Sequence, residues 1–301
     1  MKTENIVKLF KAEGIKTEKD YCVKSLTTYK IGGRAAVYAE VGNEKQLEAA
    51  LKICSAEKSD FMVFGCFSNV LIREGAIRKV FIRLKGGFEK IDFRKTHVYA
   101  GAGVKNSVFL KRLAEKGLKS AEFMAGIPGS MGGAVYMKAG AYGKCMEDII
   151  KRINVMDRKG KMKTIENKKG VFLYRGSVFQ KKTWIITGVE IRLQRGDSAL
   201  INEEIKGIIK SRHMKHPWKE NSAGSVFKNK FPRYSAGRLI EEAGMKGVSL
   251  GGAEVSRKHA NFIVNKENAS FKDVTGLINK VKRQVYKKHG IKLKEEVRII
   301  K

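Results

Sequence analysis

Residues 125 to 143 read Ala-Gly-Ile-Pro-Gly-Ser-Met-Gly-Gly-Ala-Val-Tyr-Met-Lys-Ala-Gly-Ala-Tyr-Gly, and no other stretch limits the fold as much. It contains six glycines and Pro128, one of only three prolines in the chain. Glycine permits positive φ and lets another group approach the backbone closely. A loop of this kind can turn its N–H groups inward and bind phosphate oxygens. The stretch predicts either a site for a large phosphate-bearing cofactor or a series of tight turns, because glycine-rich segments serve both purposes.

Two better-known phosphate motifs do not account for the glycines. The chain has no G-x-x-x-x-G-K-[ST] pattern, which excludes a P-loop of that type. Gly101-Ala-Gly-Val-Lys-Asn106 begins like a dinucleotide-binding fingerprint but lacks the last glycine, so it is weak support for a Rossmann unit.

The composition is that of a basic globular protein. A length of 301 residues allows about two domains, and a 43% hydrophobic content is sufficient for a sizeable core. Sixty-two basic and 30 acidic residues give a net charge of +32, which raises the alternative of a nucleic-acid-binding module. However, 45 of the basic residues are lysines spread over the whole chain, whereas readout of phosphates and bases favours clustered arginine. We interpret most of the charge as solvated surface that attracts anionic small molecules.

Cysteine spacing and hydropathy indicate the compartment. The four cysteines form no C-x-x-C pair, and the histidines show no metal-ligand pattern, so we expect no metal site. The N-terminal residues lack the apolar region of a signal peptide, and no apolar run approaches membrane-spanning length. We therefore expect a cytoplasmic protein with reduced thiols and no membrane partner.

Periodicity predicts a mixed α+β chain with a composition change near residues 195–197. The predicted helices are 43–55 (with Asn43 and Gln46 as a capping box), 106–117 (capped by Asn106), one beginning at 198, 235–243 and 270–289. The predicted strands are 61–64, 80–84, 97–100, a hairpin of 149–157 with 162–165, 184–193 and 294–300.

Three short motifs contain candidate catalytic residues. Arg175 lies in Tyr-Arg-Gly-Ser beside an apolar segment, although a surface arginine in an ion pair would look the same. Ser225 follows Gly224 and precedes apolar residues, although a lone serine is usually a turn or cap residue, and no G-x-S-x-G nucleophile elbow is present. Glu295 and Glu296 adjoin one another in a predicted strand, so one of them points inward unless the segment is an unpaired edge.

These motifs, taken in order, resemble the UDP-N-acetylenolpyruvoylglucosamine reductase family, flavoenzymes that form UDP-N-acetylmuramate for bacterial cell walls. The resemblance covers roughly residues 24 to 300 and includes Tyr29-Lys-Ile-Gly-Gly33, the glycine loop, Tyr-Arg-x-Ser, Gly-Ser-x-Phe-Lys-Asn and Glu-Val-Arg. Residues 251–265 resemble the shorter of the two family types, which lacks a tyrosine-bearing loop.

The resemblance implies an FAD-binding region of the vanillyl-alcohol-oxidase (PCMH) type over residues 1–195, in two subdomains divided near 80–85. A smaller α+β substrate domain, residues 196–301, would close over it. The implied catalytic residues are Arg175, Ser225 and Glu296. The implied cofactor residues are Tyr29, Ile31, Gly32, Gly33, Gly65, Ser68, Asn69, Gly126, Ile127, Pro128, Gly129, Ser130, Gly132, Gly133 and Ala134. The implied substrate residues are Arg212, Lys215 and Asn229.

The implied reaction uses FAD and NADPH to reduce a UDP-sugar enolpyruvyl ether. Arg175 would stabilise negative charge on the substrate carboxylate, and an inward Glu296, protonated through burial, would donate a hydrogen bond to the same group. Ser225 would give the proton as general acid. The family resemblance implies a small-molecule substrate, a monomer or weak oligomer, and no nucleic-acid partner. The alternatives are another flavin oxidoreductase of this fold, such as an oxidase, and a non-catalytic polyanion-binding module.

The chain departs from the family pattern at its binding edges. Phe67 occupies a position in the Gly65–Asn69 loop where glycine is usual, which predicts a strained loop path or weaker FAD binding. Lys138 replaces an asparagine, and His216 replaces a commoner glutamine before Pro217. Pro232 is displaced from its usual place directly after Asn229.

Overall fold

A computed structural model describes residues 2–229 and 234–301, so Pro232 lies outside the described residues. The chain forms two compact units. The first unit comprises Met1–Tyr21, Ala35–Cys66 and Arg78–Lys210. The second comprises Cys22–Arg34, Phe67–Ile77 and Ser211–Lys301, so it recruits two early segments that a single cut at 195 would assign to the N-terminal part.

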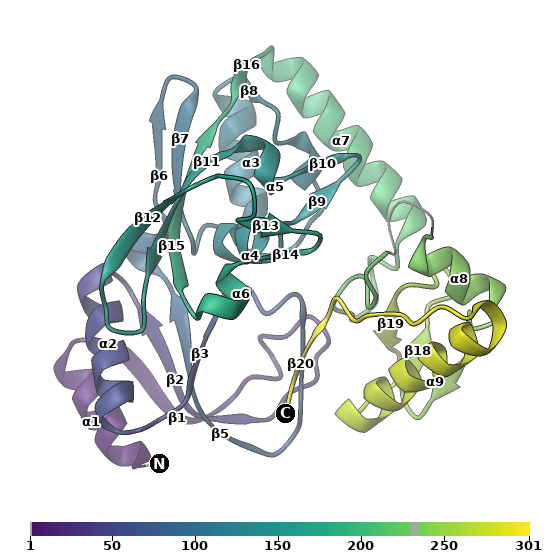
Figure 1. Ribbon diagram of the computed structural model, residues 1–301, viewed down its shortest axis with the longest axis horizontal. Helices are drawn as coiled ribbons and strands as arrows, with labels where there is room; N and C mark the ends of the chain where they lie inside the picture. The colour runs from purple at the N-terminus through teal and green to yellow at the C-terminus, as the bar shows by residue number, and fades with distance from the viewer. Residues whose placement is uncertain (1, 230–233) are drawn as a thin grey trace. The chain divides into compact units, whose positions relative to one another are not determined.

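The first unit contains a four-stranded sheet with two helices on one face (Figure 1). The strand order is β1 (Lys16–Cys22), β2 (Arg34–Val41), β5 (Ala76–Leu84) and β3 (Phe61–Phe64). The helices are α1 (Thr3–Ala12) and α2 (Glu44–Ala56), which bury Phe10 and Leu51 in the same core as Val37 of the sheet. At the start of α2, Asn43 accepts from the Gln46 N–H, but the Gln46 side chain accepts from Gly42, so only half of the predicted capping box forms.

A five-stranded antiparallel sheet forms the other half of the first unit. Its order is β12 (Met162–Glu166), β11 (Ile150–Met156), β15 (Ile185–Arg192), β7 (His97–Gly101) and β6 (Ile91–Arg94). This sheet confirms the predicted hairpin of 149–157 with 162–165. Both sheets share one hydrophobic core, which explains why the first unit is a single compact body despite its two sheets.

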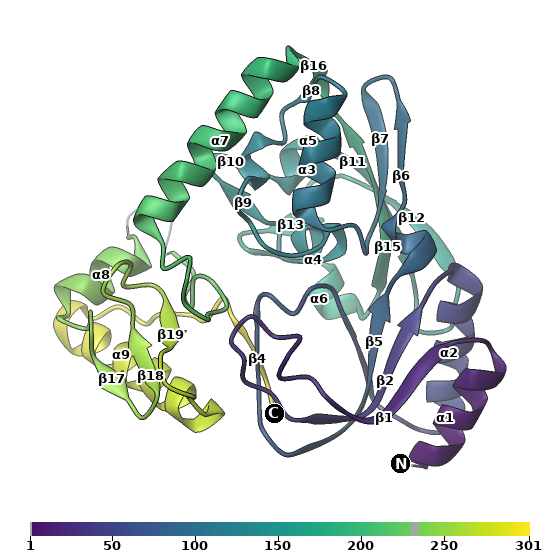
Figure 2. The same cartoon turned by 180° about the vertical axis from the view of Figure 1, so that it is seen from behind.

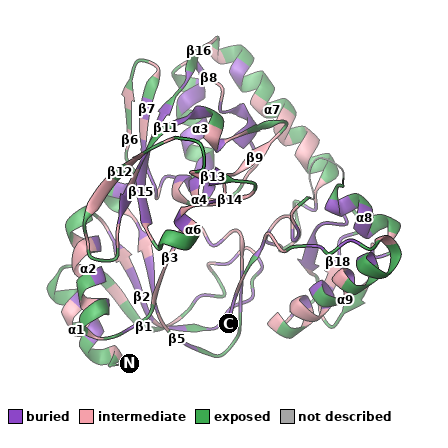
Figure 3. Ribbon diagram, in the orientation of Figure 1, coloured by how far each residue is buried: buried purple, intermediate pink, exposed green. Residues whose placement is uncertain are grey.

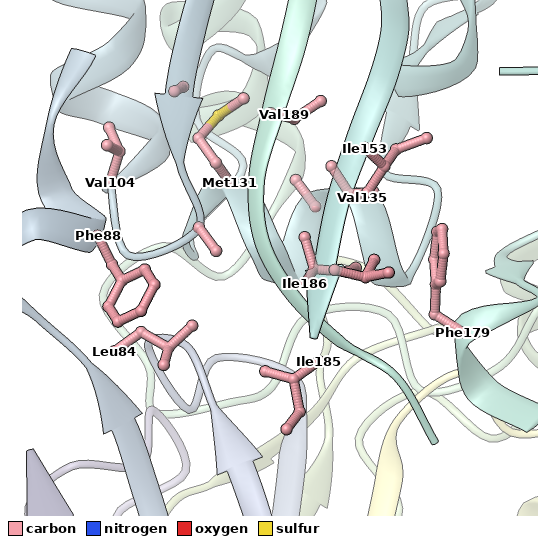
Figure 4. Close-up of a cluster of buried hydrophobic side chains, with 14 of the residues drawn as sticks. Leu84, Phe88, Val104, Met131, Val135, Ile153, Phe179, Ile185, Ile186 and Val189 are labelled. Carbon is pink, nitrogen blue, oxygen red and sulfur yellow. The ribbon is translucent and has the colours of Figure 1, made fainter. Parts of the chain in front are cut away.

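Further helices and short strands pack around this sheet. In the view of Figure 2, α3 lies in front of it. They are η1 (Gly86–Glu89), α3 (Asn106–Glu115), β8 (Leu118–Lys119), η2 (Glu122–Met124), α4 (Met131–Tyr136), β9 (Gly140–Ala141), β10 (Lys144–Cys145), α5 (Met146–Ile149), β13 (Phe172–Leu173), β14 (Gly176–Ser177), α6 (Phe179–Lys182) and β16 (Gln194–Arg195). In Figure 4, Met131 and Val135 of α4 lie among Val189 and Ile153 of the sheet. The core therefore fixes the short helix that follows the glycine loop.

The second unit is a smaller α+β body. Its elements are β4 (Val70–Ile72), α8 (Ala236–Glu242), β17 (Ser249–Leu250), β18 (Ala253–Val255), β19 (Ile263–Asn265), α9 (Phe271–His289) and β20 (Arg298–Ile300). Helix α7 (Ser198–Lys215) leads into it from the first unit. Figure 3 shows α9 buried along one side and exposed along the other, as expected for the stripe of Val274, Leu277 and Val281. Ser270 caps this helix, and Asp273 completes the capping box.

Two sequence expectations about local structure are wrong. Asn106 is the first residue of α3 and does not cap it, because its side-chain N–H donates to Ile127 O at 3.2 Å. The predicted strand 294–300 is ordered as a strand only over β20, where Arg298–Ile300 pairs in parallel with β4. Both differences arise from contacts with segments far away in the sequence.

Phe67 adopts φ +52° with a side chain only 3% exposed. The left-handed conformation costs a non-glycine residue about 1–2 kcal/mol. Removing a buried phenylalanine side chain costs about 3–5 kcal/mol. We therefore expect Phe67→Gly to destabilise the protein by about 1–4 kcal/mol, because the packing that is lost exceeds the strain that is relieved.

Urea unfolding measures this difference, and Phe67→Leu is the matched control because it keeps the strain and most of the apolar volume. We expect Phe67→Leu to lose less stability than Phe67→Gly. A glycine variant more stable than the parent protein would contradict this account of Phe67.

Candidate functional site

The glycine loop is held against the segment that follows β7 by three backbone hydrogen bonds. Met131 N donates to Val104 O at 2.8 Å, and Gly132 N donates to Ala102 O at 2.9 Å. Asn106 N donates to Gly129 O at 3.0 Å. The loop is therefore a fixed part of the first unit, as its apolar flanks predict.

Two glycines in this region have no space for a side chain. A Cβ on Gly132 would lie 2.8 Å from the Ala102 Cβ, and one on Gly65 would lie 2.3 Å from the Ser130 Oγ. Gly129 adopts φ +135°, which L side chains rarely adopt. The glycines therefore allow Gly65 and the glycine loop to approach each other, and the structure brings these two predicted cofactor segments together within the first unit.

Two buried polar atoms near the loop lack hydrogen-bond partners. Asn106 holds the loop through Nδ2, while its Oδ1 is buried and unpaired. Thr187 accepts from Ala102 N through its backbone, while its Oγ1 is also buried and unpaired. A buried unpaired polar atom costs about 1–3 kcal/mol, so such atoms indicate a position for a ligand or bound water. The glycine cradle together with these two atoms fits a phosphate-bearing, hydrogen-bonding cofactor such as FAD.

Neither Asn106 nor Thr187 is among the residues that the sequence predicted for the site. An asparagine before an apolar-periodic segment is typical of a helix cap, so the sequence does not distinguish Asn106 as a site residue. Thr187 lies in the middle of a strand pattern, and threonine is common in strands, so nothing in the local sequence distinguishes it.

The other predicted cofactor residues belong to the second unit. Tyr29 and Ile31 are almost completely buried in its core, so their side chains support this unit from inside. Thr28 Oγ1 donates to Ser68 O at 3.3 Å, which joins the Tyr29–Gly33 motif to the Ser68–Asn69 segment. A Cβ on Gly33 would lie 2.1 Å from Gly75 O, which explains a glycine there.

Two predicted catalytic residues, Ser225 and Glu296, lie on neighbouring extended segments of the second unit that form isolated β-bridges. Glu296 N donates to Val226 O at 2.7 Å, directly beside Ser225. Asn69 Nδ2 donates to Glu296 O at 3.2 Å, so the predicted pyrophosphate segment also contacts this pair of segments. Both side chains are half-buried. The neighbouring Glu295 forms an ion pair with Lys282 at 2.8 Å.

The third predicted catalytic residue, Arg175, lies in the first unit at the turn between β13 and β14. It adopts φ +50°, and its guanidinium carbon lies 6.0 Å from the centre of the Tyr174 ring. Ser177 Oγ donates to Tyr136 O at 2.9 Å, which ties this turn to the end of α4. Because α4 begins at the glycine loop, one short helix connects the Arg175 turn with the cofactor cradle.

The predicted substrate residues differ in their surroundings. Arg212 is half-buried and Lys215 exposed, both in the last turn of α7. Asn229 Oδ1 accepts from Ala236 N at 3.0 Å, so this side chain supports the start of α8. Lys138, one of the departures from the family pattern, adopts φ +46° and forms an ion pair with Glu147. Asparagine reaches this left-handed conformation more readily than lysine.

His216, another departure, belongs to a cluster of three rings. Its ring centre lies 5.2 Å from that of His259 and 5.0 Å from that of Phe262. Burial is the largest cause of a lowered pKa of about 4 for His216, and the nearby positive charges of Arg212, Lys215 and Lys258, with that of His259 when it is protonated, add to it. Burial also lowers the pKa of His259. Both rings are therefore neutral at pH 7.

Across residues 2–229 and 234–301, no three His, Cys, Asp or Glu side chains gather so that they could hold a metal ion. Within the same ranges, each helix is too short or too polar to cross a membrane.

Comparisons with known proteins agree with this geometry. Residues 35–166 match the FAD binding domain family, and residues 216–300 match the C-terminal domain of UDP-N-acetylenolpyruvoylglucosamine reductase. The chain is 38% identical to the UDP-N-acetylenolpyruvoylglucosamine reductase of Clostridioides difficile over 98% of this chain and 96% of that protein. It is 39% identical to the Heliobacterium modesticaldum protein of the same name, over 91% and 87% of the two chains.

Solved structures give the same result for the fold. The UDP-N-acetylenolpyruvylglucosamine reductase of Thermus caldophilus matches with a TM-score of 0.82 and 31% identity, over 95% of this chain and all of that one. A berberine bridge enzyme variant matches over 64% of this chain and 44% of its own, with a TM-score of 0.51 and 12% identity. That likeness concerns the fold alone and agrees with the predicted vanillyl-alcohol-oxidase (PCMH) type. On these grounds, the chain belongs to the UDP-N-acetylenolpyruvoylglucosamine reductase family.

Proposed function

We propose that this protein reduces the enolpyruvyl ether of UDP-N-acetylglucosamine to UDP-N-acetylmuramate, a step of peptidoglycan precursor synthesis, with FAD as cofactor and NADPH as reductant. The observation that carries the proposal is the 38% identity to a reductase of this name over 98% of the chain. The glycine cradle and its two unpaired buried polar atoms support it from the structure. The chemistry that the bound flavin supplies is hydride transfer, from NADPH in one half-reaction and to the enolpyruvyl group in the other.

The N-terminal and C-terminal regions of the chain have different functions in this proposal. Residues 1–195 form the FAD-binding region, in two subdomains divided near 80–85, and residues 196–301 form the substrate domain. The ranges of the two family matches, 35–166 and 216–300, support this division. Segments 22–34 and 67–77 belong to the N-terminal region by sequence and pack with the second unit.

The residues that hold the cofactor come from three segments. The glycine loop supplies Gly126, Ile127, Pro128, Gly129, Ser130, Gly132, Gly133 and Ala134. The second segment supplies Gly65, Ser68 and Asn69, and the third supplies Tyr29, Ile31, Gly32 and Gly33. Backbone N–H groups of the glycine-rich segments suit pyrophosphate oxygens, because no side chain blocks their approach.

Arg175, Ser225 and Glu296 act on the enolpyruvyl group. Hydride addition at its methylene carbon places negative charge on the neighbouring carbon and its carboxylate. The permanently charged guanidinium of Arg175 stabilises that charge, and Glu296 in its protonated form donates a hydrogen bond to the carboxylate. Ser225 then donates its hydroxyl proton to the charged carbon as general acid. Buried Val226 and Phe227 beside Ser225 reduce the access of water to this proton transfer.

Arg212, Lys215 and Asn229 bind the UDP-sugar, since two of them are cations suited to a diphosphate. We propose a cytoplasmic monomer or weak oligomer that acts without a nucleic-acid or membrane partner. The dispersed lysines support this proposal, because many of them form surface ion pairs, such as Lys52 with Glu48 and Lys246 with Glu241.

The first prediction concerns FAD. We expect the purified protein to be yellow and to release free FAD into the supernatant on acid treatment, because no Cys or His occurs in residues 125–143 to form a covalent link. Gly132→Ala should weaken FAD binding at least about 10-fold, since its Cβ would force the loop away from Ala102. Titration with FAD, followed by flavin fluorescence, measures the change.

Gly207→Ala is the matched control, because a Cβ on this helical glycine meets nothing within 4 Å. It should bind FAD like the parent protein. A protein that remains colourless after incubation with FAD would contradict the proposed function.

The second prediction concerns Arg175. We expect Arg175→Lys to lower turnover by about 100- to 1,000-fold, because an ammonium cannot form the two parallel hydrogen bonds that a guanidinium gives to a carboxylate. Stability should change little, since lysine bears the same positive-φ cost as arginine. Steady-state kinetics and thermal unfolding measure the two effects, with exposed Arg192→Lys as the control. If Arg175→Lys keeps the turnover of the parent protein, Arg175 is a surface arginine without a catalytic role, the alternative that the sequence also allows.

The third prediction separates the two half-reactions. Ser225→Ala should leave flavin reduction by NADPH nearly unchanged, because Ser225 has no proton to give in that step. Reoxidation by the enolpyruvyl substrate should slow by about 100- to 10,000-fold, the usual loss for a general acid. Rapid-mixing absorbance at the flavin band reads each step separately. If both steps slowed equally, Ser225 would be a turn residue whose loss disturbs the fold.

A further inference from the structure

The side chain of Asn261 forms hydrogen bonds with the backbone of the segment that contains Ser225. Asn261 Oδ1 accepts from Phe227 N at 3.0 Å, and Asn261 Nδ2 donates to Phe227 O at 2.8 Å. Val226 N also donates to the backbone oxygen of Asn261 at 2.8 Å. These three bonds fix both residues that follow Ser225. Asn261 is only 4% exposed, so water does not compete for them.

The position of Asn261 depends in turn on His259. Asn261 N donates to His259 Nδ1 at 3.1 Å, and Phe262 N donates to the His259 backbone oxygen at 2.9 Å. Because a backbone N–H can only donate, the ring nitrogen that accepts from it carries no proton. The lowered pKa of His259, caused mainly by burial, agrees with a neutral ring.

The ring of His259 is also fixed by packing. It lies 5.0 Å from the ring of Phe262 and 5.2 Å from that of His216, centre to centre. On another side, a Cβ built on Gly237 of α8 would lie 3.1 Å from His259 Cε1, so the imidazole packs directly against the backbone of this glycine.

Phe262 connects the cluster of His216, His259 and Phe262 with Ser225. Ser225 and Phe262 form an isolated antiparallel bridge. Residues directly opposite in an antiparallel pair have their Cβ atoms about 4.5–5.5 Å apart on the same face. The side chain of Ser225 thus shares a face with the ring that packs on both histidines.

We propose that His259 is a positioning residue of the reaction, which holds Ser225 in place through Asn261 and Phe262. The inference rests on the proposed function, in which Ser225 donates the proton. His259 touches no reacting atom in this account. Its unprotonated Nδ1 fixes Asn261, and Asn261 fixes the segment that carries the hydroxyl. Small errors in the position of a catalytic group are costly, with about 100-fold in rate for a displacement of 1 Å.

The test compares His259→Leu with His259→Asn. Leucine keeps apolar bulk but removes the acceptor, whereas the asparagine Oδ1 branches from Cγ as the histidine Nδ1 does and can still accept from Asn261 N. We expect His259→Leu to slow flavin reoxidation by the enolpyruvyl substrate at least about 10-fold, with flavin reduction by NADPH unchanged. His259→Asn should recover most of that loss. His289→Leu is the control, since His289 lies on α9 near Glu242.

Two further variants distinguish the possible failures. Ser225→Ala with His259→Leu should be no slower than Ser225→Ala alone, because a misplaced hydroxyl and an absent one have the same consequence. If Ser225→Ala is slow but His259→Leu is not, the positioning role is wrong and the proposed function stands. If Ser225→Ala itself reoxidises normally, the proton-donor role of Ser225 fails, and the role of His259 fails with it.

A purely structural role of His259 would give a different pattern. It would lower the melting temperature and slow both half-reactions alike, and His259→Asn would not restore the second one. Should His259→Leu not fold, Gly237→Ala provides the same test, because its Cβ displaces the intact imidazole by a few tenths of an ångström. Selective slowing of reoxidation in Gly237→Ala supports the inference, and unchanged reoxidation overturns it.

Discussion

The close approach of the glycine loop to the segment after β7 is the constraint on which the first unit depends. The hydrogen bond from Gly132 N to Ala102 O is possible only because Gly132 has no Cβ to meet Ala102. The same approach brings Met131 and Val135 of α4 into the core, and α4 in turn anchors the turn that carries Arg175. One contact between backbones thus determines the positions of the cofactor cradle and a catalytic candidate.

In the second unit, polar side chains hold the segments that carry the predicted catalytic residues. Ser225 and Glu296 lie on short segments that form no extended ladder, so few regular backbone bonds hold them. Asn261 supplies missing bonds through an amide group that both donates and accepts, and Asn69 Nδ2 donates one more. A buried amide with all its bonds satisfied gives a more definite geometry than apolar packing alone.

The large positive charge has a modest role in stability. Most ion pairs in the described residues are between partly exposed side chains, and exposed pairs contribute about 0–1 kcal/mol each. The excess of lysine therefore adds little to stability, and the field that it creates around the protein falls off within about 8–10 Å at physiological salt.

Local patterns in the sequence determined the elements and the outline of the site. Caps, periodicity and glycine act over a few residues. The sequence therefore predicts the capped helix at 271–289, the hairpin of β11 and β12, and a loop without side chains at Gly129 and Gly132. The motif resemblance identified the family, and the fold class followed from it.

Only the tertiary structure decided which of these residues meet. Asn106 bonds to Ile127 instead of capping its own helix, Asn69 bonds to Glu296 across 227 positions, and Asn261 bonds to Phe227 across 34. The same is true of segments 22–34 and 67–77, which join the second unit. A polar side chain can bond to any group that the folded backbone brings near, so its partner is fixed by long-range packing and leaves no periodic signal in the sequence.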